Sequence, residues 1–133
     1  MNFKKLIEIS YALQPRYATG RNFHCTFLLK KSRLLSVGWN NYIKSHPINL
    51  NFNYKDKNGD DARYHVGLHS EASAWLRYGQ ENTSDLTWVN IRIMRCGGIG
   101  LARFCVGCQN LIKQAGFKRA FYSVAGGRFE EFE

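Results

Sequence analysis

Three segments of the chain repeat apolar residues at the spacing of an amphipathic helix. They cover residues 2–14, 69–78 and 105–115, and Pro15, Gly79 and Gly116 are expected to end them in turn. The residues that share one face of each predicted helix should be buried. These are Phe3, Leu6, Ile7, Ser10 and Leu13 in the first, Ala72, Trp75 and Leu76 in the second, and Cys108, Leu111, Ile112 and Ala115 in the third.

Other segments follow the two-residue period of β-strands. Residues 22–30 and 34–39 form a predicted hairpin around a turn at 31–33, and residues 86–95 and 118–124 form two more strands. Residues 96–100 are predicted as a turn or flexible loop, and the tail 129–133 is compatible with a short edge strand. The faces expected to be shared are Phe23, Cys25, Phe27 and Leu29; His24, Thr26 and Leu28; and Val89, Ile91 and Ile93.

Residues 41–67 show neither period, and they contain Pro47, several asparagines and the polar run 55–61. A structureless loop of this length is uncommon unless it is functional or mobile. We therefore expect this segment to flank the functional site and to have a mobile tip.

The predicted order of elements is helix, hairpin, helix, strand, helix, strand. Strands joined by crossover helices are expected to become parallel neighbours. The predicted fold class is therefore α/β, a three-layer α/β/α sandwich around a mixed sheet. A length of 133 residues is typical of one domain, and we see neither an internal repeat nor a second domain, so we expect a single domain over residues 1–133.

Composition narrows the class of protein further. Hydrophobic residues make up 44% of the chain, which is sufficient for a core, but no window reaches the apolar length of a membrane span. Residues 1–10 lack the long apolar segment of a signal peptide. We therefore expect a cytoplasmic protein with no membrane partner, whose four cysteines are metal ligands or buried thiols rather than disulfides.

The net charge is +9, from 19 lysines and arginines against 10 acidic residues. Such a surface attracts polyanions and phosphorylated molecules. The basic residues are scattered, however, and the only tight cluster (Lys30, Lys31 and Arg33) falls at the predicted hairpin tip. The charge therefore leaves nucleic acid open as a partner without requiring it.

The clearest candidate chemistry lies in His69, Glu71, Cys105 and Cys108. One imidazole and two thiolates give zinc three ligands and leave a fourth position for water, as in catalytic zinc sites. The two cysteines are three residues apart at a predicted helix start, so both sulfurs can reach one ion. Glu71, two residues after His69, supplies a carboxylate that can carry a proton between that water and a substrate.

Each motif has a plainer interpretation when taken alone. The Cys-x-x-Cys pair could be a redox pair or half of a structural metal site, and His-x-Glu could be a helix cap with a surface charge. The two motifs together, on predicted helix starts separated by a strand, favour a deaminase. Cys25 and Cys96 are expected to be buried or incidental thiols. The remaining histidines, His24, His46 and His65, are ordinary hydrogen-bonding residues or phosphate or base contacts.

From about Arg21 to Tyr122 the sequence resembles the cytidine and deoxycytidylate deaminase superfamily. Besides the two motifs, residues 36–40 (SVGWN) are similar to the second strand of that family, and residues 111–119 resemble its helix-to-strand passage. Residues 44–47 with 68–71 resemble small deaminase-like proteins from phage genomes. The first metal-ligand motif begins with histidine rather than cysteine. In this respect the sequence resembles deoxycytidylate, tRNA-adenosine and polynucleotide cytosine deaminases more than free-cytidine deaminases.

The resemblance implies several site residues. The backbone at Ser70 would hold the base carbonyl, Asn40 the sugar or base, and Tyr122 would help to enclose the ring. Two positions depart from the family, since Phe104 replaces a proline before the first cysteine and Ser70 replaces an alanine. Phe104 makes the pocket shape less certain, whereas the Ser70 hydroxyl could add a hydrogen bond.

The sequence thus predicts a zinc-dependent hydrolase that converts deoxycytidylate to deoxyuridylate, with Glu71 as proton shuttle and Arg21 and His46 available to grip the phosphate. Deamination of cytosine or adenine in single-stranded DNA or RNA is the alternative, and a zinc-stabilised nucleotide-binding protein without turnover is a third. The family commonly assembles, so we also expect a homo-oligomer.

Overall fold

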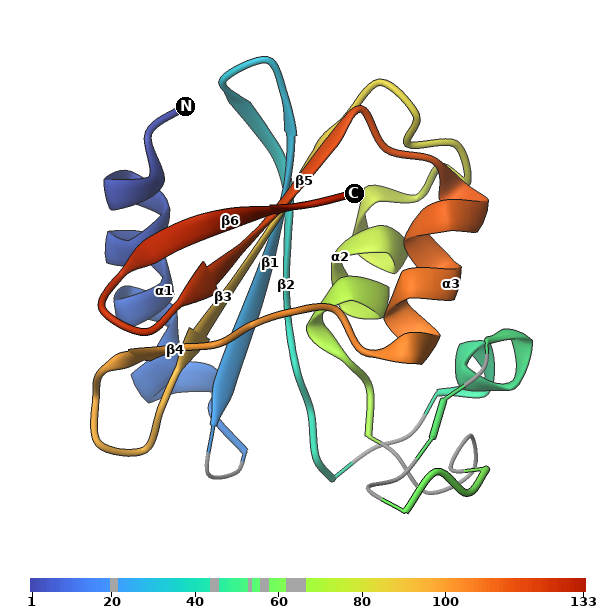
Figure 1. The fold of residues 1–133 in the computed structure, drawn as a ribbon, viewed down its shortest axis with the longest axis horizontal. Coiled ribbons are helices and arrows are strands. Elements are labelled where there is room, and N and C mark those ends of the chain that lie inside the picture. The colour runs from blue at the N-terminus through green and yellow to red at the C-terminus, as the bar shows by residue number, and fades with distance from the viewer. Residues whose placement is uncertain (20–21, 44–45, 53, 56–57, 62–66) are drawn as a thin grey trace.

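A computed structural model describes residues 1–19, 22–43, 46–52, 54–55, 58–61 and 67–133 (Figure 1). The main strands form a sheet in the order β2-β1-β3-β5-β6, and the short strand β4 pairs with β3. The β3–β5 pair is parallel, whereas the other pairs are antiparallel. The strands are β1 (Phe23–Lys30), β2 (Arg33–Trp39), β3 (Thr87–Ile93), β4 (Ile99–Gly100), β5 (Arg119–Val124) and β6 (Arg128–Phe132).

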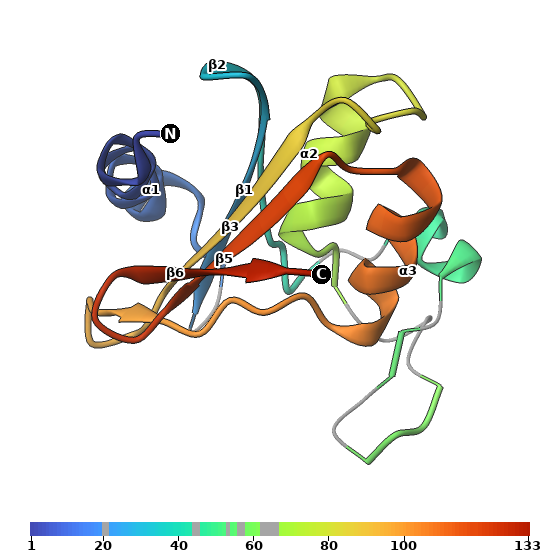
Figure 2. The same cartoon turned by 45° about the horizontal axis from the view of Figure 1, so that its top comes forward.

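The helices lie on both faces of this mixed sheet. Helix α1 (Phe3–Tyr17) covers one face, and α2 (Ser70–Tyr78) and α3 (Val106–Ala115) cover the other, as Figure 2 shows. A short 3-10 helix, η1 (Pro47–Asn51), lies between β2 and α2 in the sequence. The predicted three-layer α/β/α sandwich is confirmed. None of the described helices is long and apolar enough to span a membrane.

The alternation along β1 divides the core into two clusters as predicted. Phe23, Cys25, Phe27 and Leu29 pack in the cluster under α1, while Leu28 belongs to the cluster under α2 and α3. Thr26 shares the Leu28 face and is fully buried. The predicted ligands His69, Cys105 and Cys108 belong to the starts of α2 and α3, so they lie on the face of the sheet that these two helices cover.

The glycine of β2 lets α2 lie directly on the sheet. A Cβ atom at Gly38 would come within 2.2 Å of the Ala74 backbone nitrogen and 2.5 Å of the Ser70 carbonyl oxygen. The hydroxyl of Ser36 also donates to the Ala74 carbonyl at 2.8 Å. These contacts hold α2 directly against β2, and His69 is the residue that precedes the helix.

The structure corrects two predictions about the helices. Pro15 lies inside α1, which continues to Tyr17, because a proline near the end of a helix removes the donor for only one carbonyl. Leu76 is 38% exposed and is not part of the buried stripe of α2. The close approach to β2 turns Ser70 and Ala74 toward the sheet instead, and this rotates Leu76 outward.

Two predictions about the strands are also corrected. The segment expected to be only a turn contains β4, in which Ile99 and Gly100 pair with Ile93 and Arg92 of β3. Crossover connections give parallel neighbours only for β3 and β5. Strands β2 and β3 run in the same direction, but β1 pairs with both and lies between them.

The irregular segment between β2 and α2 is closed at its ends by a two-residue bridge. The Asn41 N–H donates to the Leu68 carbonyl at 2.8 Å, and the Leu68 N–H returns to the Asn41 carbonyl at 3.0 Å. This bridge brings the start of α2 beside the end of β2. The predicted mobile tip falls partly on residues 56–57 and 62–66, which lie outside the described residues, and it stays a prediction.

Candidate metal centre and catalytic cavity

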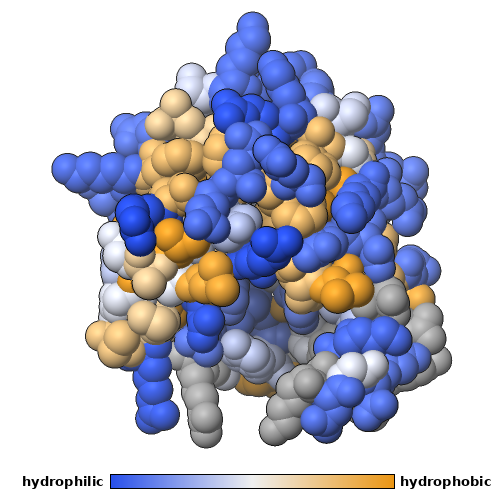
Figure 3. Space-filling view, in the orientation of Figure 1, coloured by the Kyte–Doolittle hydropathy of each residue, from blue (hydrophilic) through white to orange (hydrophobic). Residues whose placement is uncertain are grey.

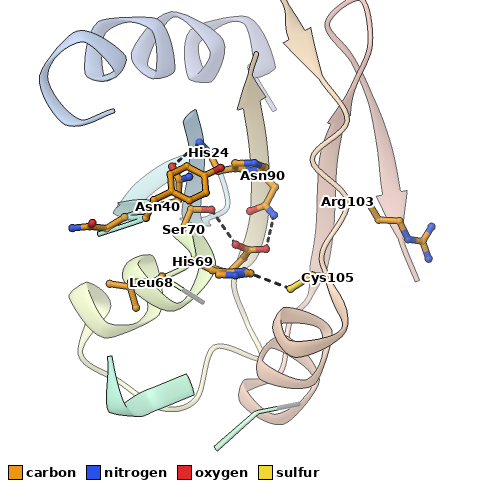
Figure 4. A pocket seen from close by; sticks show the side chains of 12 residues that line it. His24, Asn40, Leu68, His69, Ser70, Asn90, Arg103 and Cys105 are labelled. Atoms are coloured by element: carbon orange, nitrogen blue, oxygen red, sulfur yellow. Dashed lines mark hydrogen bonds between the residues drawn. The ribbon is translucent and has the colours of Figure 1, made fainter. Parts of the chain in front are cut away.

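Three sulfur and nitrogen atoms converge where α2 and α3 begin. The Nδ1 atom of His69 lies 3.5 Å from Cys105 Sγ and 3.4 Å from Cys108 Sγ, and Figure 4 shows the His69 and Cys105 side chains turned toward each other. Tetrahedral zinc with ordinary bond lengths holds nitrogen and sulfur ligands roughly 3.6 Å apart. These three residues therefore fit a zinc ion with little movement, and they form a group able to hold a metal.

The local fold explains this convergence. His69 occupies the N-cap position of α2 and Cys105 that of α3, while Cys108 lies in the first turn of α3. A hydrogen bond with Cys108 lowers the pKa of Cys105 to about 5, although burial acts in the opposite direction. Burial raises the pKa of Cys108 well above its ordinary value. The pair thus offers one ready thiolate, and a bound cation would favour the second.

The Glu71 carboxylate is buried and receives hydrogen bonds on both oxygens. Ser70 Oγ donates to Oε1 at 3.0 Å, and Asn90 Nδ2 donates to Oε2 at 2.9 Å. Burial alone would raise the pKa of Glu71, but the charge of His69 and the Asn90 hydrogen bond outweigh it and lower the pKa. Glu71 is therefore an ionised carboxylate that can accept a proton.

A cavity of about 400 Å³ contains His69, Cys105 and Glu71 in its wall. The face drawn in Figure 3 is hollowed near its lower centre, below the segment that leads into α3 in Figure 1. This volume lies within the usual range for small-molecule sites, ~300–1,000 Å³. The remaining lining residues are His24, Asn40, Asn41, Tyr42, Gly67, Leu68, Ser70, Asn90 and Arg103.

Two of the predicted substrate residues line this cavity. Asn40 accepts a hydrogen bond from the His24 N–H at 2.9 Å and donates one to the Asn22 carbonyl at 3.2 Å, so its side-chain amide is held against β1. Ser70 lies at the start of α2, and its hydroxyl makes the extra hydrogen bond that its replacement of alanine suggested. Whether either residue contacts substrate stays a prediction.

The other predicted substrate residues are not brought to the cavity. Tyr122 is buried on β5, where its hydroxyl donates to Glu130 at 3.0 Å, and it is not among the lining residues. His46 caps η1, because its Nδ1 accepts from the Ile48 N–H at 3.0 Å, and it too is absent from the lining. Arg21 lies outside the described residues.

Phe104, which replaces the proline of the resembled family, anchors the segment before the first cysteine. Its ring is buried and packs edge-on against Phe132 at 5.4 Å and Tyr122 at 6.5 Å between centroids. The neighbouring Arg103 extends away from the other labelled side chains in Figure 4, and its guanidinium lies 5.9 Å from the Tyr122 ring. The departure from proline thus ties Cys105 to the core through an aromatic cluster.

Several polar residues in the cavity wall, Asn90 among them, are not among the site residues that the sequence predicts. For His24 the sequence leaves open an ordinary hydrogen-bonding role or a phosphate or base contact, and it assigns no role to Asn90. Burial lowers the pKa of His24 to about 4, so the ring is neutral at neutral pH and acts as a hydrogen-bonding group. The available signal was their alternation with apolar neighbours, which places both on the Thr26 side of the sheet.

The fold is similar to that of a solved protein. The crystal structure of cytidine deaminase from Burkholderia pseudomallei aligns with a TM-score of 0.59 and 13% sequence identity, covering 100% of this chain and 93% of that chain. The chain therefore has the cytidine deaminase fold. No family model matches the sequence. No curated protein matches it significantly either.

Proposed function

We propose that this protein is a zinc-dependent hydrolase that deaminates the cytosine base of a nucleotide, converting deoxycytidylate to deoxyuridylate. The observation that carries the proposal is a cavity lined by His69, Cys105 and a buried, ionised glutamate, with Cys108 completing a group of three ligand atoms at zinc spacing. The similarity of the fold to a cytidine deaminase supports the same chemistry.

The residues present fit zinc, with His69, Cys105 and Cys108 as its ligands. Zinc in such a site supplies an activated water as nucleophile. Glu71 can accept one proton of the attacking water on its carboxylate and transfer it to the ring nitrogen of the base. It can then accept the second proton of that water and pass it to the exocyclic amine, which leaves as ammonia. Ser70 and Asn90 hold the two carboxylate oxygens while this happens.

The size of the cavity favours a nucleotide, because about 400 Å³ suits a single small ligand. One observation favours single-stranded nucleic acid as the second candidate. Tyr42 lines the cavity but is 51% exposed, and an exposed aromatic ring beside the site could stack on a flanking base. The net charge of +9 is compatible with either substrate.

The test is to incubate the zinc-loaded protein with cytosine and adenine nucleosides, nucleotides and oligonucleotides, and to measure ammonia and the product base. Deoxycytidylate should be converted to deoxyuridylate. Glu71→Gln should keep zinc and the fold but lose turnover by several orders of magnitude, since the proton carrier is gone. Near-normal activity of that variant would refute the role of Glu71.

Salt dependence separates the two substrates. Polynucleotide binding weakens steeply with salt because several counterions are released, whereas one phosphate contact gives a shallow slope. A higher kcat/KM on a cytosine oligonucleotide than on deoxycytidylate, with a steep salt slope, would favour the second candidate. If the zinc-loaded protein turns over nothing in the panel, it is a binding protein and the enzymatic proposal fails.

A further inference from the structure

The Tyr54 side chain lies against the candidate metal ligands. It comes from the irregular segment between β2 and α2, yet it is only 1% exposed. Its ring meets the His69 ring edge-on, with centroids 4.7 Å apart and an interplanar angle of 61°. Its hydroxyl oxygen lies 3.4 Å from Cys108 Sγ. One aromatic side chain therefore touches two of the three ligands.

Gly107 leaves the space that this ring occupies. A Cβ atom at position 107 would lie 2.3 Å from Cδ1 and 2.5 Å from Cγ of Tyr54. Real Cβ atoms do not come so close to a neighbour, so any other residue at this position would displace the ring. Gly107 lies between Cys105 and Cys108 in the first turn of α3. Because this turn has no side chain at position 107, the Tyr54 ring can pack directly against it.

The hydroxyl of Tyr54 has a specific partner. A buried hydroxyl that lacks a hydrogen bond is costly, and packing alone would be served equally well by phenylalanine. Cys108 is 0% exposed, so water does not reach its sulfur in place of the phenol. When Cys108 is a thiolate ligand it carries no proton, and the phenol must then be the donor.

We propose that Tyr54 is a positioning residue of the metal site, where its ring orients His69 and its hydroxyl donates to the Cys108 thiolate. This inference rests on the zinc site of the proposed function. Outer-shell partners of this kind orient metal ligands and typically contribute 10–100-fold to metal affinity.

The same contact links the metal to the segment that carries Tyr54. The Tyr54 N–H donates to the Phe52 carbonyl at 3.0 Å, and the Phe52 ring meets Trp75 of α2 edge-on at 6.2 Å between centroids. Because coupling between two equilibria is reciprocal, a metal that is bound more tightly through Tyr54 must also stabilise the packing of this segment.

The first test measures zinc affinity by competition with a chromophoric chelator. Tyr54→Phe keeps the ring and removes the donor, and it should bind zinc about 10-fold more weakly than the wild type. Tyr17→Phe is the matched control, because Tyr17 is partly exposed and stacks on Trp39 away from the site. Equal zinc affinities for Tyr54→Phe and the wild type would overturn the inference.

The second test is a double-mutant cycle that uses the direct packing of the Tyr54 ring against Gly107. Gly107→Ala should weaken zinc binding in the wild-type background, because its methyl group displaces the Tyr54 ring. In a Tyr54→Ala background the same substitution should have no further effect. Equal losses in both backgrounds would show that Gly107 acts without Tyr54 and would contradict the inference.

Failure of this inference is distinguishable from failure of the proposed function. A wild-type protein that binds zinc but deaminates nothing would overturn the enzymatic proposal, while the affinities of the Tyr54 variants would still decide the present one. A wild-type protein that binds no zinc overturns both. Circular dichroism of the metal-free variants shows whether a lost affinity reflects a lost fold.

Discussion

At the scale of single residues, the orientation of Glu71 depends on hydrogen bonds from Ser70 and Asn90. Asn90 donates to Glu71 and to the Ala102 carbonyl, so its amide oxygen is left to accept from the Thr26 hydroxyl. Thr26 Oγ1 also lies 2.8 Å from Ser70 Oγ, but each hydroxyl has one proton, which Thr26 donates to Asn90 and Ser70 donates to Glu71. Thr26 and Asn90 are cross-strand partners on β1 and β3, so the sheet itself holds the amide that donates to Glu71.

Thr26→Val should therefore reduce turnover without removing the metal. Valine has nearly the same shape, but it leaves the buried Asn90 oxygen without a donor and frees the amide to turn. We expect kcat to fall roughly 10-fold, equivalent to about 1.4 kcal/mol, with unchanged zinc content. Thr26→Ser restores the hydroxyl and should recover the rate. Steady-state kinetics and metal analysis check this, and equal kcat for the two variants would contradict it.

His24 should make the fold sensitive to acid. Its pKa is lowered by burial to about 4 in the folded protein, against about 6.5 in an unfolded chain. The unfolded state binds the extra proton first, so stability is lost as the pH falls from about 6.5 to 4. Between pH 7 and 4.5 the wild type should lose roughly 2 to 3 kcal/mol more than His24→Gln in urea unfolding. Parallel losses would show that His24 does not contribute.

At the scale of elements, the site depends on the close approach of α2 to β2. The helix can start beside the sheet only because Gly38 has no side chain, and the helix start in turn places His69. In the same way, the buried Phe104 precedes the cysteines of α3 and holds its start against the core. The positions of the candidate ligands thus depend on how the N-terminal ends of α2 and α3 pack against the rest of the fold.

Gly38→Ala should consequently loosen both the fold and the metal site. The added methyl group meets backbone atoms of α2, which cannot rotate away, and such overpacking costs about 1–3 kcal/mol. Urea unfolding should show this loss, and zinc affinity should fall with it. Gly98→Ala is a suitable control, since its Cβ would meet side chains only at 3.6 Å and beyond. Unchanged stability of Gly38→Ala would refute the packing argument.

At the scale of the whole molecule, the ligands of the site come from two segments more than thirty residues apart in the chain. An ion held by such a site binds the folded chain and not the unfolded one, so its binding energy adds to folding stability. Association into a homo-oligomer would likewise add its binding energy to the stability of the folded chain. The homo-oligomer stays a prediction, and light scattering tests it.

Removing zinc should therefore lower the melting temperature. At a thousandfold excess over Kd, a ligand stabilises by about 4 kcal/mol, which corresponds to a rise in Tm on the order of 10 °C. Calorimetry with and without a chelator should show this shift in the wild type. Cys105→Ala should melt at one temperature regardless of chelator. A wild type whose Tm ignores the chelator would exclude a metal that contributes to stability.

The sequence by itself determined the local elements and the candidate ligand set. Alternation along β1 predicted which side chains face each layer, because successive side chains of a strand point to opposite faces of the sheet. The Cys105–Cys108 spacing at a helix start reported a shared direction, since residues three apart lie on one side of a helix. Both patterns depend only on residues close together in the chain, so the folded structure keeps the side-chain directions that they predict.

Only the tertiary structure decided how these pieces meet. Several features of the structure have no local signature in the sequence. They are the place of β1 between β2 and β3, the outward turn of Leu76, the burial of Tyr122 away from the cavity, and the contacts of Tyr54 and Asn90. Each depends on packing between residues distant in the chain, as when Gly38 admits α2 or Gly107 admits the Tyr54 ring. Such pairings are selected by the shape of the whole core, which no window of sequence contains.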